Sequence, residues 1–220
     1  MRTRTLIFAF LFSFPITVTG QNNFKSTAYS DDECYPEGWN HEEARGELNG
    51  DGIADLVVWA QPNDSSNMKI RDDGYVYNFN RPVLAIYFGK KSGGYTLWKE
   101  YSDILPYQSD EYSFYDTSLK VTERRSFIVS VSIFNSAGSY DNPTYSYVFR
   151  YQNGDFYKIG EETNSFSRNS GDGEKVSINY LTHRQCVTTY NVFDDRVKEK
   201  NVWSTIPRKP LILLGSEELE

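Results

Sequence analysis

A run of nine residues, Glu47 to Asp55, has the residue types and the spacing of a loop that holds a metal ion. Side-chain oxygens stand at its first, third, fifth and ninth positions, in Glu47, Asn49, Asp51 and Asp55. Gly52, at the sixth position, permits the sharp turn that gathers them around one cation. Carboxylates held so close repel one another unless a cation offsets their charge, and oxygen ligands suit a hard ion. We therefore expect a Ca²⁺ site, with the carbonyl oxygen of Ile53 as a further ligand.

This loop differs from an EF-hand, and the same residues can also be interpreted as a turn that binds no metal. An EF-hand has a bidentate Glu at position twelve and continues as a helix. Here position twelve is Val58, and the apolar run Leu56 to Ala60 has the residue types of a strand. The alternative without a metal is an acidic turn, Asn-Gly followed by Asp-Gly, that leads into this strand.

The segment Gly46 to Val57, GELNGDGIADLV, resembles the D-x-[DN]-x-D-G-x-x-D-L motif of FG-GAP/VCBS-type repeats. Such repeats form the calcium loops of integrin-like β-propellers and of many exported bacterial proteins, so the resemblance implies a calcium loop in a β-protein. Glu47 departs from the motif, which has Asp at that position. A weaker likeness to small exported bacterial proteins with one such motif lies at Phe149 to Phe156 and at Ser177 to Thr182. The resemblance implies no particular activity.

The N-terminus has the features of a secretory signal peptide. Arg2 and Arg4 precede an apolar stretch from Leu6 to Phe14, and small residues at 18–20 offer a cleavage site. The stretch is too short to cross a bilayer, so we expect no membrane span. We interpret 1–20 as a signal peptide and 21–220 as a single β-domain. The protein is therefore expected to be exported, either periplasmic or secreted.

The chain is acidic, with a formal charge of −7. An acidic surface repels nucleic acid, so we expect no nucleic-acid partner. The charge is compatible with divalent cations or with a basic protein partner.

Cys34 and Cys186 are the two cysteines of a chain that we expect in an oxidising compartment. We predict a disulfide between them. The alternative is two unpaired thiols, because the sequence does not show their separation in space. A zinc site is not indicated, since His183 lies near Cys186 but no further Cys or His pair completes a set of four ligands.

The elements that must position these residues are strands. After the loop, segments rich in Val, Ile, Tyr, Phe and Thr alternate with turn signals, without a helical period. The sequence predicts hairpins over 81–101, 112–134, 145–159 and 175–192, a short strand over 211–214, and irregular loops over 61–74 and 161–173. The fold class is therefore all-β, an antiparallel meander of hairpins that forms a sandwich, an open barrel or a partial propeller-like sheet.

The sequence shows no catalytic constellation. His41 and His183 are the only histidines, and neither lies in a motif that exposes a nucleophile. Carboxylate pairs for glycoside hydrolysis cannot be matched by sequence when the partners are distant along the chain. We therefore name no catalytic residue, and we leave open whether the alternating Tyr145, Tyr147, Phe149 and Tyr151 form core or an exposed binding strip.

The hypothesis drawn from the sequence is an exported, calcium-stabilised β-domain that acts as a protein-binding module, for instance as an inhibitor or immunity-type protein. One alternative is a hydrolase that acts on an envelope glycan or phosphoester. Another is a glycan-binding module that uses exposed Tyr and Trp, with Trp39, Trp98 and Trp203 as candidates.

Overall fold

The computed structural model describes residues 24–219, so the expected signal peptide 1–20 lies outside the described residues. The described chain forms antiparallel sheets and two short 3-10 turns, η1 (Asp31–Glu33) and η2 (Ser65–Asn67). The predicted all-β, antiparallel fold is confirmed. No helix within residues 24–219 has the length and apolar character needed to cross a membrane.

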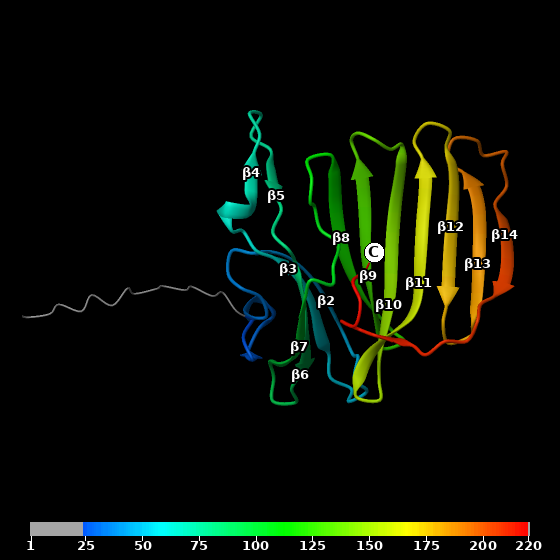
Figure 1. The fold of residues 1–220 in the computed structure, drawn as a ribbon. Coiled ribbons are helices and arrows are strands. Elements are labelled where there is room, and N and C mark those ends of the chain that lie inside the picture. Colours follow the sequence, from blue (N-terminus) through cyan, green and yellow to red (C-terminus); the bar gives the residue numbers. More distant parts are fainter. Residues whose placement is uncertain (1–23, 220) are drawn as a thin grey trace, which may run out of the picture.

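The first sheet has five strands in the order β1-β7-β6-β3-β2. These are β1 (Thr27–Ala28), β2 (Asn40–Gly46), β3 (Asp55–Gln61), β6 (Val83–Gly89) and β7 (Tyr95–Ser102). The segment that connects β3 to β6 along the chain forms a small hairpin of β4 (Met68–Ile70) and β5 (Val76–Asn78), which projects from the sheet (Figure 1). Strand β3 is apolar without alternation because both of its faces are covered, and Leu56, Val57 and Val58 are all fully buried.

The second sheet is a meander in which the strand order follows the chain from β8 to β14 (Figure 1). Its strands are β8 (Ser113–Thr122), β9 (Ser126–Asn135), β10 (Asp141–Gln152), β11 (Asp155–Ser167), β12 (Asp172–Asn179), β13 (Arg184–Asn191) and β14 (Lys200–Thr205), and β15 (Ile212–Leu213) pairs with β11. The predicted hairpin at Asn153-Gly154 is confirmed. Both residues have positive φ, +53° and +85°, as a short turn between twisted strands requires.

The main core lies between the two sheets, over the part of the meander that starts at β8. Phe127, Phe149 and Phe156 are at most 1% exposed and pack with Val57 and Ile86 of the first sheet. Strands β12 to β14 extend beyond this region, and no strand of the five-stranded sheet covers them (Figure 1). Within residues 24–219 the fold is therefore a sandwich at one end and a single open layer at the other.

The alternating aromatic residues of β10 belong to this core. Tyr147 and Phe149 are buried, and Tyr145 and Tyr151 pack against them from its margin. The sequence left open whether these residues form core or an exposed binding strip, and the structure shows that they form core.

A C-terminal segment links the two sheets. Leu214 and Leu219 are buried in the main core, and the Leu219 backbone N–H donates to Ile104 O at 2.8 Å. The ammonium group of Lys158, on β11, lies 2.9 Å from a Glu217 carboxylate oxygen and 3.2 Å from Glu161. This salt bridge fixes the C-terminal segment against the meander.

Two predicted loops are partly strands. The stretch 161–173 was expected to be irregular, but β11 continues to Ser167 and β12 begins at Asp172. Its polar residues suit a strand here because no second layer opposes them, and pairing with β10 and β12 satisfies their backbone groups. The stretch 61–74 contains η2 and β4.

Candidate functional site

The candidate metal loop joins β2 to β3 and is held by hydrogen bonds within the chain. Asp51 Oδ1 accepts the Ile53 N–H at 2.8 Å, and Asn49 Oδ1 accepts the Asp51 N–H at 3.0 Å. The Glu47 carboxylate accepts the Gly50 N–H. Gly50 and Gly52 have φ of +91° and +80°, a conformation that favours glycine. The sharp turn expected from the sequence is therefore present.

Asp55 is the most deeply buried member of the loop, with no exposed surface. Its Oδ2 accepts the Leu48 N–H at 2.8 Å and the Asn49 N–H at 3.3 Å, while Oδ1 accepts the Gly89 N–H at 2.9 Å. Burial raises the pKa of the Asp55 carboxyl, and the three backbone N–H groups act against that rise. Asp55 thus fastens the start of β3 to the loop before it and to the end of β6.

The oxygens of this loop are of the type that calcium prefers, and each of the four side chains also has a hydrogen-bond donor within the chain. Glu47, Asn49, Asp51 and Asp55 each accept at least one N–H from the protein itself. Within residues 24–219 no three acidic, His or Cys side chains lie close enough together to hold a metal ion. Calcium ligation by these side chains and by the Ile53 carbonyl stays a prediction.

Arg125 brings a positive charge to the loop from the other sheet. It lies in the turn between β8 and β9, and its Nε is 4.0 Å from Glu47 Oε2. A Cβ at Gly50 would lie only 2.6 Å from Arg125 Nη1, so the guanidinium rests against the loop backbone. We expected a calcium ion to offset the negative charge of the loop carboxylates. Arg125 of the chain itself offsets part of that charge. This contact was not predictable from the sequence, because Arg125 is distant from the loop along the chain.

The predicted disulfide between Cys34 and Cys186 is wrong for this structure, in which both thiols are free and buried. Cys34 belongs to the cluster beneath the first sheet, and its Sγ lies 3.6 Å from Ser30 O. Cys186 lies on β13, in the uncovered part of the meander, with its Sγ 3.8 Å from Thr188 Oγ1. The two cysteines are in different sheets, a separation that their number and compartment did not reveal.

The two histidines are also far apart in the fold. His41, on β2, stacks on Tyr35 with ring centroids 3.7 Å apart, and His183 lies in the turn between β12 and β13 with φ of +54°. In the described residues, these contacts bring no Ser, Thr or Cys side chain to either imidazole as a candidate nucleophile.

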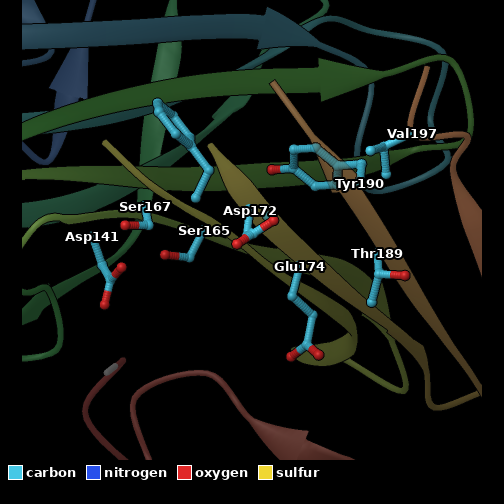
Figure 2. A pocket seen from close by; sticks show the side chains of 10 residues that line it. Asp141, Ser165, Ser167, Asp172, Glu174, Thr189, Tyr190 and Val197 are labelled. Atoms are coloured by element: carbon cyan, nitrogen blue, oxygen red, sulfur yellow. The ribbon is translucent and has the colours of Figure 1, made fainter. Parts of the chain in front are cut away.

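A pocket of about 520 Å³ opens on the far end of β10 to β13 and gathers three carboxylates that the sequence did not connect. Asp141, Asp172 and Glu174 line it, from β10 and β12 (Figure 2). The side chain of Asn191 donates to Asp172 at 2.9 Å, and this bond, with help from Ser170, lowers the pKa of Asp172. The pocket therefore holds at least one carboxylate in its ionised form, which suits binding of hydrogen-bond donors.

The edge of the meander, β14, is the most exposed strand of the fold. All six of its residues are exposed, including Val202 at 51% and Trp203 at 60%. The guanidinium carbon of Arg184 lies 4.5 Å from the centre of the Trp203 ring. Trp39 and Trp98, the other two candidates for glycan contact, pack on Phe24 and Phe88. Of the three, Trp203 is the one that a partner can reach most fully.

Comparisons with models of known protein families, with characterised proteins and with solved structures gave no match. The resemblance to FG-GAP/VCBS-type repeats therefore rests on residues 46–57 and stays a prediction.

Proposed function

We propose that this chain is an exported β-domain that binds a protein partner by adding a strand of that partner to β14. The observation that carries the proposal is one edge of the meander, where β14 pairs with β13 and, among the described residues, with no second strand. An edge strand presents unpaired N–H and C=O groups that an extended segment of another protein can satisfy. Val202 and Trp203 supply apolar area beside those groups.

The charge around β14 indicates what kind of segment fits. Residues 184–209 contain six basic residues, Arg184, Arg196, Lys198, Lys200, Arg208 and Lys209, and three acidic ones, Asp194, Asp195 and Glu199. This end is therefore basic (6 − 3 = +3) in a chain whose formal charge is −7. Two copies joined through β14 would bring these positive charges together, whereas an acidic segment is attracted. The partner strand is acidic, in contrast to the basic partner compatible with the overall charge.

Site-specific photo-crosslinking tests this proposal in cells that produce the protein. A benzoylphenylalanine placed at Trp203 should give one discrete crosslinked product, and the same group at Tyr29, which is 81% exposed and lies by the other sheet, should not. Val202→Asp should abolish the product, because it removes apolar area from the edge and places a negative charge against an acidic partner strand. Equal crosslinking from both positions, or a product that survives Val202→Asp, would show that β14 is not the binding edge.

A hydrolase is the second candidate, favoured by the carboxylates that share the pocket at Asp141, Asp172 and Glu174. General acid catalysis needs a carboxyl group with a raised pKa. The described carboxyl groups whose pKa is raised, Glu43 and Asp55, lie in the other sheet. Release of reducing ends from envelope glycans, lost on Glu174→Gln, would support the hydrolase over the binding module.

A further inference from the structure

A groove of about 970 Å³ crosses the outer face of the meander, opposite the core. Side chains alternate between faces along a strand, so Ser130 and Ser146 point away from the core to which Val129 and Tyr147 belong. The groove runs over β8 to β12 and is lined by hydroxyl groups, among them those of Ser118, Ser130, Ser146 and Ser177. Ser118, Ser130 and Ser146 are direct cross-strand partners, which places their hydroxyl groups in one row.

Three cationic side chains stand at the end of this groove near the turn between β8 and β9. They are Lys120, Arg124 and Arg150. Within residues 24–219 none of the three forms a side-chain hydrogen bond or an ion pair. The Nε of Arg150 is moreover buried without an acceptor, which is costly unless a ligand or water supplies one. The ammonium and guanidinium groups of these three side chains can therefore donate hydrogen bonds to a molecule in the groove.

Their spacing suits one bound anionic group. Lys120 pairs with Ile128, Ile128 pairs with Val148, and Val148 is two residues from Arg150 on the same face. With strands about 4.8 Å apart and about 7 Å between alternate residues, the two Cα atoms are roughly 12 Å apart. Side chains as long as Lys and Arg can meet across that distance.

The acidic residues of the groove equal the cations in number but are not paired with them. Glu123, Glu161 and Glu162 line the groove, so its lining is formally neutral (3 − 3 = 0) in a chain of formal charge −7. Glu161 lies 3.2 Å from Lys158, outside the lining, and among the described residues none of the three cations of the groove forms an ion pair with a carboxylate.

We infer that this groove binds an acidic oligosaccharide, with Arg150 and Lys120 on a carboxylate and the hydroxyl row on the sugar hydroxyl groups. Ser hydroxyls both donate and accept, as sugar hydroxyls do, and a guanidinium binds a carboxylate in a bidentate manner. The lining residues include no aromatic side chain, so recognition is by hydrogen bonds and charge. Nucleic acid is disfavoured because single strands are held by stacking on aromatic rings. This site lies on the sheet face and is independent of strand addition at β14.

The test is calorimetric titration of residues 21–220 with oligogalacturonate and with its methyl ester, which keeps the hydroxyl groups and lacks the charge. We expect saturable binding of the acid that weakens with salt, and binding of the ester weaker by at least about tenfold. Arg150→Gln and Lys120→Gln should each weaken binding of the acid by a similar factor. Arg208→Gln, a charge change outside the groove, should not.

Several results would overturn the inference. These are absence of saturable binding, equal affinity for acid and ester, or wild-type affinity in both Arg150→Gln and Lys120→Gln. Equal affinity for oligoglutamate would assign the groove to acidic peptides instead. Because neither Arg150 nor Lys120 has a side-chain partner in the part of the chain that the structure describes, both variants should keep the wild-type unfolding temperature. The two variants together keep the test informative if one of them misfolds.

Discussion

Asp55→Ala should be the most damaging single change in the acidic loop, for reasons that do not involve a metal. The change leaves three backbone N–H groups without their acceptor. The Leu48 N–H is buried, and an unpaired buried donor costs about 1–3 kcal/mol. The N–H groups of Asn49 and Gly89 are partly buried, can reach water, and add about 0.5–1 kcal/mol each. The free energy of unfolding should therefore fall by about 3 kcal/mol, or roughly 10 °C in unfolding temperature.

The assay is denaturant unfolding of residues 21–220, followed by tryptophan fluorescence, with Ca²⁺ in excess and again with chelator. Asp51→Ala is the matched control, because its carboxylate is exposed and accepts only exposed donors within the loop. We expect Asp55→Ala to lose about the same stability in both conditions and Asp51→Ala to lose less than about 1 kcal/mol in chelator.

Two outcomes would refute this reasoning. If Asp55→Ala is no less stable than Asp51→Ala in chelator, the buried hydrogen bonds do not carry the stability. If the wild-type protein loses several kcal/mol on chelation and both variants then match it, the loop is a calcium site whose ligands rearrange from the geometry described above.

Three further predictions concern titration, the C-terminal segment and the thiols. Because burial raises the folded pKa of the Asp55 carboxyl above 3.8, the part of the stability that depends on its protonation is full below pH 3.8 and is lost as the pH rises through the folded pKa, while the hydrogen bonds to the carboxylate persist. Asp55→Asn should flatten this part of the stability–pH curve. Lys158→Met should cost about 1–2 kcal/mol in urea unfolding, since Glu161 loses its partner, and Lys69→Met, in an exposed pair, should cost less than about 1 kcal/mol. Both thiols are buried, so they should resist dithionitrobenzoate until the protein unfolds, and for Cys34 burial also raises the pKa to about 12. Absence of thiols in the unfolded protein would contradict the structure.

The fold was predictable where local signals decide it. Asn153-Gly154 set a tight turn between aromatic runs, and the apolar run after Asp55 became a buried strand. The polar stretch 161–173 was not predictable, because a strand in an uncovered sheet needs neither alternation nor apolar residues. Strand β14 was not predicted for the same reason, since all six of its residues are exposed and its sequence has no apolar alternation that packing against a second layer would require.

The candidate sites were less predictable because their members come from distant parts of the chain. The acidic loop is contiguous, and its turn geometry was expected correctly. Arg125, the carboxylates around Glu174 and the cations beside Arg150 come together only through the strand order of the meander. No periodicity in a single sequence reports such an assembly.

The meander has a kinetic consequence, because its strand order is the same along the chain and across the sheet. Each of the strands β8 to β14 pairs with its immediate neighbour in sequence, so this sheet can grow one hairpin at a time with short loop closures. Opening can proceed in reverse from the uncovered end, where β14 is held by a single ladder. Partial unfolding of β14 should thus leave the core between the sheets intact and expose β13 as a new edge. A partner strand that slows this fraying would protect amide hydrogens well beyond the residues it touches.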